Sequence, residues 1–428
     1  MSVMTKLWIT FNLIITMNSR RNLFLWILYD FANSLVSIVF FLYFSQWVIV
    51  DGGVADIWFN LTFTISAVFL LLTVPITGVL LDKYWRRITG LRYSTTSTLV
   101  FYGLCGFFAV TGNEIYALIT FTLGLYSYLL SFTFYSPLLL DVSTPSNRGR
   151  ISGYGIAANY LGQIVGLSMV LPFSNGSLSL FGGSPRAETL LPAVAVFFIF
   201  ALPTLIFFKE PHKNSSPHSL RAETKKFWRE SIDLFLYPGI FAFLIAFFFL
   251  NDAVLTASNN FPIFLERVWG VSDTIKTYLL LGALITSSVG GIISGFIADK
   301  AGHKKTLVFI MIGWLFILPV LAFIQNFKIF VIVAILMGFW FGANWAVSRS
   351  VMGYLAPQGR HNLAFAFFGL VERASSFVGP IVWGLIATSL VSLGSDRYRI
   401  AAVSLTVFIV FGLIALVRVR DDRVKNVL

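Results

Sequence analysis

The chain has 428 residues, of which 57% are hydrophobic and 12% are charged, against roughly 25% charged residues in soluble globular proteins. This composition excludes a soluble globular domain and predicts a protein that lies mostly in lipid. The net charge of +12 would fit nucleic acid as a partner, but the basic residues gather in short clusters between long apolar runs, so no nucleic acid is expected.

Twelve apolar runs of about 20 residues follow one another, each long enough to cross roughly 30 Å of hydrocarbon as a helix. In the first half they cover residues 24–50, 58–81, 92–111, 115–140, 151–172 and 189–208, and in the second half residues 236–262, 275–298, 306–325, 329–352, 362–390 and 398–417. The runs are too long and too uniformly apolar for barrel strands, so the expected fold is an all-α membrane protein with twelve transmembrane helices.

The stretch Leu7–Met17 precedes the first run and is apolar but too short to span. No small-residue cleavage site follows it, so we expect an interfacial helix, or a start placed upstream of Met17, rather than a signal peptide. Cys105 is the single cysteine, and the four histidines are dispersed over loops, so no metal site and no cofactor are expected.

Basic residues alternate between the connections of the twelve runs. Most of the 31 Lys and Arg residues fall on one side, and the other side holds Arg186, Arg267, Lys276, Lys328, Arg397 and Arg399. This asymmetry predicts that both termini and the central loop are cytoplasmic. Short loops and termini favour a bacterial inner (plasma) membrane, and an organelle membrane stays open as the alternative.

The longest polar interval, Lys209–Asp233, divides the spans six and six. About 25 residues are too few to bury a core of their own, so we interpret the interval as a linker. The predicted organisation is an N-terminal bundle over residues 1–208 with a short interfacial segment, a cytoplasmic linker over 209–235, and a C-terminal bundle with a tail over 236–428.

A short phrase occurs at equivalent places in the two halves. Gly78 lies four residues before Asp82-Lys83, Gly295 lies four residues before Asp299-Lys300, and a basic cluster follows each pair. The phrase Thr144-Pro145 to Arg150 is similarly echoed by Ala356-Pro357 to Arg360. Two repeating halves in a membrane protein are typical of secondary transporters, which rock two bundles about a central site.

The repeated phrases predict a gate at the cytoplasmic ends of the spans. Glycine lets a neighbouring helix approach, and the aspartate can accept hydrogen bonds at a helix N-terminus. Asp141 is a candidate partner for Arg86 or Arg87. The predicted gate residues are Gly78, Asp82, Arg86, Arg87, Asp141, Arg150, Gly295, Asp299 and Lys300. The alternative is that each basic cluster only stops the chain from crossing the membrane during insertion and has no role in a gate.

At these phrases the chain resembles the major facilitator superfamily, and within it the vacuole-effluxer-like group related to the autophagy-associated amino-acid exporter of yeast vacuoles. Tyr29-Asp30-Phe31-Ala32-Asn33-Ser34, the entry to span five at Arg148–Gly155, and Phe367-Phe368-Gly369-Leu370 with Gly379-Pro380 carry the resemblance, which covers about residues 24–385. The first loop departs from the superfamily pattern at Tyr84, and span seven departs from the group's phrase at Ala253. The resemblance implies two pseudo-symmetric six-helix bundles in which spans 1, 4, 7 and 10 line a cavity.

Polar side chains within spans are costly, so each is a candidate for function. Helical spacing puts them on stripes in four spans. The predicted substrate or proton residues are Trp26, Asp30, Asn33, Asn159, Gln163, Asp252, Thr256, Trp345, Arg349 and Glu372. We expect Asp30 and Asp252 to bind a substrate ammonium or a coupling proton and Arg349 to hold a carboxylate. The alternative is that Arg349 only neutralises an acid.

These features predict a monomeric secondary transporter, not an enzyme, that moves a small polar or zwitterionic solute by alternating access. Amino acids are favoured by the resemblance and by the mixture of acidic and basic groups. A larger amphipathic compound, such as a drug or siderophore, is the alternative, although the arginine phrase of many drug antiporters is absent from span four. A non-transporting receptor or scaffold is the alternative of another class, for which the central loop offers little surface.

Overall fold

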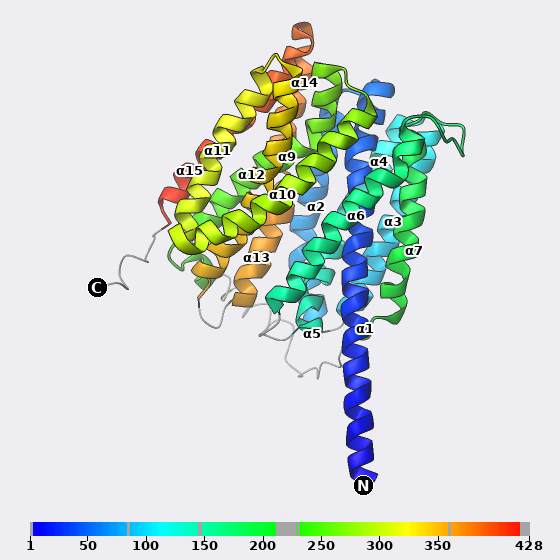
Figure 1. Cartoon of the computed structure of the whole chain (residues 1–428), viewed down its shortest axis with the longest axis vertical. Coiled ribbons are helices and arrows are strands. Elements are labelled where there is room, and N and C mark those ends of the chain that lie inside the picture. The colour runs from blue at the N-terminus through cyan, green and yellow to red at the C-terminus, as the bar shows by residue number, and fades with distance from the viewer. Residues whose placement is uncertain are drawn as a thin grey trace. The chain divides into compact units, whose positions relative to one another are not determined.

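The computed structural model describes residues 3–83, 86–143, 148–210, 229, 232–357 and 361–419. Within these ranges the side chains of residues 3–19, 74–83, 140, 148–150, 152–153 and 361–362 are not described. The described chain consists of helices joined by short connections, and these ranges hold no strand (Figure 1). This matches the apolar runs of the sequence, because in lipid a helix satisfies its own backbone hydrogen bonds.

The helices follow one another in a simple order along the chain. They are α1 (Val3–Val39), α2 (Asp56–Lys83), α3 (Arg87–Val110), α4 (Glu114–Tyr135), α5 (Leu139–Val142), α6 (Arg148–Ser174), α7 (Leu190–Phe207), α9 (Ile240–Phe264), α10 (Asp273–Ala301), α11 (His303–Phe323), α12 (Phe327–Leu355), α13 (His361–Ala374), α14 (Gly379–Ser389) and α15 (Asp396–Val417). Short 3₁₀ turns occupy Ser136–Leu138, Ala187–Thr189 and Val391–Leu393.

Twelve helical stretches in the described residues are long and apolar enough to cross a membrane. They lie close to the twelve predicted runs: the sixth, for example, is Ala187–Phe207 and the ninth is His303–Phe323. Residues 7–17, expected as a separate interfacial segment, belong to α1, which continues into the first span without a break.

Spans one and seven share an unusual ending. Two π-helical segments, Phe40–Phe44 and Trp47–Asp51, follow α1, and another, Leu265–Trp269, follows α9. π-helical turns are rare in proteins, and many of those that do occur lie at functional sites. Their occurrence at equivalent positions of the two halves supports the internal repeat predicted from the sequence.

The chain divides into two compact units. Unit 1 contains residues 1–44 and 74–217, and unit 2 contains residues 45–73 and 218–428. The first part of α2 therefore packs with helices of the second half of the chain. The predicted boundaries at 208 and 236 stay a prediction.

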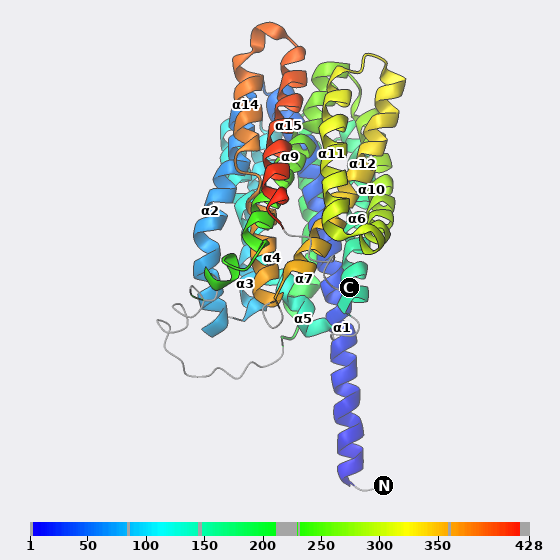
Figure 2. The same ribbon diagram turned by 90° about the vertical axis from the view of Figure 1, so that its left-hand side faces the viewer.

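In unit 1, α1 packs against α6 and α7, and α3 packs against α4 (Figures 1 and 2). Gly162 and Gly166 of α6 face the backbone of α1 at Phe31 and Leu35, where a side chain would collide with the carbonyl oxygens. Small residues of this kind let membrane helices approach closely. The close contact fixes the polar face of α6 against the polar face of α1.

In unit 2, α10 and α12 run side by side in both views (Figures 1 and 2). Gly290 of α10 lies against the carbonyl of Phe339, and Gly342 of α12 lies against the carbonyl of Ser287. The contact is therefore made by glycines on both helices, which brings the two backbones together.

Span eleven, predicted as one run, is broken. α13 ends at Ala374 and α14 begins at Gly379, with a non-helical stretch between them. Pro380 lies in the first turn of α14, where its missing N–H removes no intrahelical bond. The break exposes backbone groups in the middle of a span, and these need partners.

Candidate functional site

In unit 1 the predicted polar stripe of span one meets the predicted polar stripe of span five. Nδ2 of Asn159 on α6 lies 3.5 Å from Oδ1 of Asp30 on α1. Nε2 of Gln163, one turn further along α6, donates to Oδ1 of Asn159 at 2.7 Å. The structure thus brings three of the predicted site residues into one chain of polar contacts.

A pair of stacked aromatic rings lies beside Asp30. The rings of Trp26 and Tyr135 are stacked with centroids 5.2 Å apart and planes 7° apart, and the Tyr135 hydroxyl donates to the Trp26 carbonyl at 3.0 Å. A Cβ at Gly155 would press on the Trp26 ring and lie 3.2 Å from Oδ2 of Asp30. Gly155 therefore keeps α6 clear of both groups.

Two neighbouring polar groups are buried without a hydrogen-bond partner in the described part of the chain. They are the Trp26 indole N–H and both side-chain polar atoms of Asn33, which is 1% exposed. Buried polar groups normally have partners, so unpartnered ones indicate water or a ligand. Residues 26, 30 and 33 share one face of α1, as the sequence predicted.

In unit 2, Asp252 of α9 is fully buried and faces the break in span eleven. Its Oδ2 accepts hydrogen bonds from the amides of Val378 at 3.1 Å and Gly379 at 2.9 Å. The carboxyl therefore caps the N-terminus of α14, where a negative charge is favoured. The polar stripe of span seven does not predict this role, because a stripe on one span does not reveal a break in another.

The predicted cation of span ten lies beside an acid of span eleven. Nη2 of Arg349 on α12 is 3.8 Å from Oε1 of Glu372 on α13, and the Arg349 side chain is 43% exposed. Arg373, adjacent to Glu372, donates instead to the carbonyl of Gly369 at 3.1 Å. The ring of Trp345 packs against Phe341. The Glu372 contact is long and partly solvated, so Arg349 can still bind another carboxylate.

The predicted cytoplasmic gate is described only in part. Nη1 of Arg87 lies 3.3 Å from Oδ2 of Asp141, one of the two partners expected for this acid, and Arg86 precedes α3. Asp299 and Lys300 are exposed at the end of α10, and a Cβ at Gly295 would meet nothing within 4 Å. For Asp82 and Arg150 only the backbone is described, and the surroundings of Gly78 are not described. The gate role stays a proposal.

Hydrogen bonds between buried polar side chains in unit 2 hold residues 45–73 against the second half of the chain. We call this set, which includes Asn60 with Asn260 and Asp56 with Tyr398, the clasp. It was not predicted from the sequence. Asn60 of α2 and Asn260 of α9 exchange two amide hydrogen bonds, at 3.1 and 2.8 Å. The hydroxyl of Tyr398 donates to Oδ2 of Asp56 at 3.1 Å. Both asparagines are fully buried. Their occurrence within apolar runs was the available signal.

A buried lysine completes the clasp. Nζ of Lys276 contacts Gln46, Glu266 and Asp273, and its side chain is 0% exposed. Its position in the sequence predicts only a charge in a connection between spans. A buried ammonium is stable only with such partners, so the cluster fixes the end of span one against α10.

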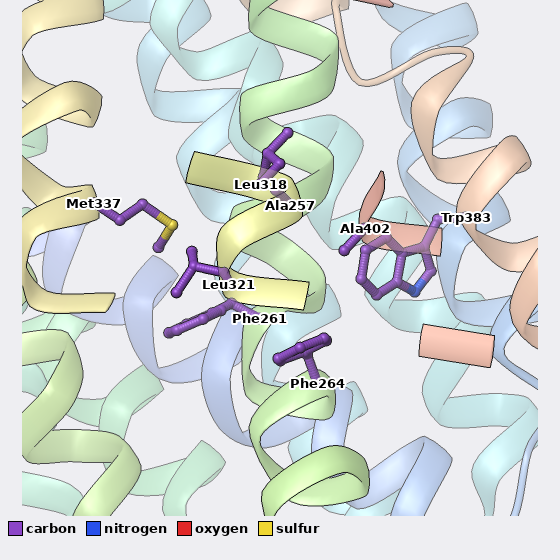
Figure 3. A pocket seen from close by; sticks show the side chains of 8 residues that line it. All are labelled: Ala257, Phe261, Phe264, Leu318, Leu321, Met337, Trp383 and Ala402. Carbon is purple, nitrogen blue, oxygen red and sulfur yellow. The ribbon is translucent and has the colours of Figure 1, made fainter. Parts of the chain in front are cut away.

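An apolar pocket in unit 2 contains none of the predicted site residues (Figure 3). Its lining comes from α9, α11, α12, α14 and α15: Ala257, Phe261, Phe264, Leu318, Leu321, Met337, Trp383 and Ala402. A lining of this kind fits hydrocarbon rather than a zwitterion, because it offers no charged group.

Known structures share the fold. A bacterial homologue of the human lysosomal transporter Spinster, in an inward-facing and unoccupied conformation, matches 94% of this chain and 97% of its own with a TM-score of 0.70 and 13% identity. The nucleoside transporter NupG matches 92% of this chain and 98% of its own with a TM-score of 0.69 and 13% identity. The fold is thus the major facilitator fold, as predicted, with twelve helical spans in the described residues.

Residues 141–427, more than half of the chain, match the family described as vacuole effluxer Atg22 like, and the chain belongs to this family. The MFS-type transporter YxiO of Bacillus subtilis is 23% identical over 94% of this chain and 95% of its own. A homologue of the multi-drug resistance efflux pump PmrA from Lactococcus lactis is 25% identical over 93% of this chain and 95% of its own. Autophagy-related protein 22 of Candida glabrata is 27% identical over 35% of this chain and 30% of its own. The protein is a membrane transporter and not an enzyme.

Proposed function

We propose that the protein carries a small zwitterionic solute, with amino acids favoured, by proton-coupled alternating access. The observation that carries the proposal is the cluster of Asp30, Asn33, Asn159 and the stacked pair Trp26 and Tyr135 in unit 1. The family description, vacuole effluxer, agrees with transport of a solute.

The cluster in unit 1 has the chemistry of an ammonium site. The Asp30 carboxylate supplies a negative charge at the depth of a membrane span, where such a charge is retained for function. Aromatic faces within about 6 Å attract a cation, most strongly for Trp. Asn33 and the Trp26 indole offer further polar atoms for the same solute.

Arg349 in unit 2 is the proposed partner for a solute carboxylate. A guanidinium binds a carboxylate through two parallel hydrogen bonds, and these are stronger than the long contact to Glu372. Glu372 then acts as the ion partner of Arg349 when no solute is bound.

The proposal is tested by solute uptake into proteoliposomes with a panel of amino acids. Asp30→Asn removes the charge at nearly constant size and is expected to reduce uptake by about tenfold or more, because a charge-assisted hydrogen bond is lost. Glu114→Gln, at the start of α4, removes an acid outside the cluster and should leave uptake unchanged. Equal uptake by Asp30→Asn and the wild type would contradict the ammonium site.

The alternative cargo is a larger amphipathic compound. The relative from Lactococcus lactis, described as a homologue of a multi-drug resistance efflux pump, favours this alternative. Competition separates the two cargoes: amino acids should compete with one another, and hydrophobic cations should not. Transport of hydrophobic cations with no amino-acid competition would replace the first proposal by the second.

A cytoplasmic location of both termini and of the Arg87–Asp141 pair belongs to the same proposal. It is supported by the Lys and Arg asymmetry of the connections, which are expected to be richer in Lys and Arg on the cytoplasmic side. A membrane-impermeant reagent added to intact bacterial cells should fail to label a cysteine placed at Arg20 and should label one placed at Gly112. The reverse pattern would overturn the orientation.

A further inference from the structure

The Asn251-Asp252 pair of α9 meets the break in span eleven with both side chains. Nδ2 of Asn251 donates to the carbonyl of Glu372 at 2.9 Å and to Oγ of Ser375, at the end of α13. Oδ2 of Asp252 accepts the amides of Val378 and Gly379, at the start of α14. The pair thus supplies partners to both broken ends of the span.

The second oxygen of the Asp252 carboxyl has no such partner. Oδ1 of Asp252 and Oγ1 of Thr256, one turn further along α9, are both buried and accept or donate no hydrogen bond in the described structure. Both face Gly379, where an added Cβ would collide with both oxygens. A charged oxygen buried without a donor is strongly unfavourable. The pair of oxygens therefore indicates a ligand.

A proton is the ligand that fits. A hard metal cation takes about six or more oxygen ligands, and only these two unpartnered oxygens face Gly379 among the described residues. A proton needs one oxygen to bind it and one to accept its hydrogen bond. Asp252 and Thr256 supply these two atoms.

We propose that Oδ1 of Asp252 is the binding site of the coupling proton, with Oγ1 of Thr256 as its hydrogen-bond acceptor. The proposal deepens the proposed function, on which it rests, because it separates the proton carboxyl, Asp252, from the solute carboxyl, Asp30. Binding forms an O–H bond at Oδ1 with a proton from water on one side of the membrane. Release to water on the other side restores the carboxylate.

The proton changes how firmly α14 is held. An ionised carboxylate is a stronger acceptor for the two amides than a neutral acid, and its charge suits a helix N-terminus. Protonation of Oδ1 leaves Oδ2 as a neutral acceptor. The cap on α14 is then weaker.

The same face of α9 connects the carboxyl to the clasp. Phe377, directly before the two amides, accepts a hydrogen bond from the Thr64 hydroxyl of α2 at 2.9 Å. Asn260, two turns beyond Asp252, pairs with Asn60 of α2 and also donates to the Thr256 carbonyl at 3.0 Å. Loosening of α14 therefore weakens the contacts that hold α2 in unit 2.

No ion pair within the described residues joins Asp252 to a charged group on an element packed against α9. Glu372 pairs with Arg349, and Arg373 donates to the carbonyl of Gly369. The remaining such groups are Glu266 and Arg267 after α9, Lys328 at the start of α12, and Asp396, Arg397 and Arg399 at the start of α15. The Asp252 carboxyl accepts hydrogen bonds from the backbone amides of Val378 and Gly379, which do not titrate. Its titration is therefore separable from theirs.

The first experiment is infrared difference spectroscopy on the purified full-length protein without solute. A protonated-carboxyl band is expected to disappear between mildly acidic and alkaline pH in the wild type, to be absent from Asp252→Asn, and to persist in Asp30→Asn. Thr256→Val, which keeps the side-chain shape, should shift this band. If Asp252→Asn does not fold, the Thr256→Val shift decides. A band that survives in Asp252→Asn, that Thr256→Val leaves unshifted, or that never titrates overturns the proposal.

The second experiment is hydrogen exchange of residues 56–64, corrected for the intrinsic effect of pH. In the wild type their exchange should be about fivefold faster at acidic than at alkaline pH, because a charged cap becomes a neutral one. Asp252→Asn should exchange at the acidic rate at both pH values. A pH-independent wild type would contradict the link to α2. Neither experiment uses a solute, so failure of amino-acid transport leaves them interpretable.

Discussion

Gly379 occupies a position where any side chain would collide with Oγ1 of Thr256 and with the carboxyl and carbonyl oxygens of Asp252. The glycine therefore lets the start of α14 approach α9 closely enough for the two amide contacts. Its requirement is steric rather than conformational, since it lies in the first turn of a helix.

We expect Gly379→Ala to destabilise the protein by about 1–3 kcal/mol, because overpacking of a tight site shifts the backbone. Thermal unfolding in detergent measures the effect. Gly103→Ala in α3 is the control, since its Cβ would meet nothing within 4 Å and alanine is the better helix former. Equal stability of Gly379→Ala and the wild type would show that α14 can move away from Asp252.

At the residue scale the sequence predicted part of the site. Helical spacing put Asp30 on a polar stripe of span one and Asn159 and Gln163 on a stripe of span five, and these stripes are in contact in the structure. That the three residues bind solute or a proton stays a prediction. The capping role of Asp252 was not predicted, because it depends on the break in span eleven. Gly379-Pro380 was a helix-start signal that could have revealed that break.

At the scale of elements, the contact of α10 with α12 depends on glycines that face a carbonyl of the other helix. A Cβ added at Gly290 would collide with the backbone of Phe339, whereas a Cβ added at the neighbouring Gly291 would lie 3.5 Å or more from α12, an ordinary contact distance. The two adjacent glycines thus form a matched pair for a test of packing.

Gly290→Ala is expected to reduce stability by about 1–3 kcal/mol, since the new methyl group would force the helices apart. Gly291→Ala should change stability by much less and serves as the control. Thermal unfolding of the two variants, side by side, measures the difference. Equal melting temperatures would mean that α10 and α12 separate at little cost.

The ends of each membrane span could be predicted well from the sequence, because apolar length and charge placement determine where a span begins and ends. The twelve runs correspond to the twelve spans. The π-helical ends of spans one and seven could not be predicted, because the apolar composition is unchanged across them. These irregularities depend on tertiary contacts.

At the scale of the molecule, the clasp joins the start of α2 to helices of the second half. Asn60 and Asn260 are each other's partners, so removal of one leaves a buried amide without its partner. This cost is about 1–3 kcal/mol. The pair can therefore be examined by a double-mutant cycle.

We expect Asn60→Leu and Asn260→Leu each to destabilise the protein, and the double variant to lose less than the two single effects combined, because no unpartnered amide remains. Thermal unfolding measures all three. Asn113→Leu, at an exposed end of α4, is the control. Additive effects in the cycle would show that the reciprocal pair does not act as a unit.

Span one and α2 each have residues in both units. The passage on span one falls between Phe44 and Ser45, beside its π-helical segments. The passage on α2 falls between Thr73 and Val74, next to Pro75, whose ring removes an intrahelical hydrogen bond. If the two units move as separate bodies, span one and α2 are therefore the helices whose backbone has to bend.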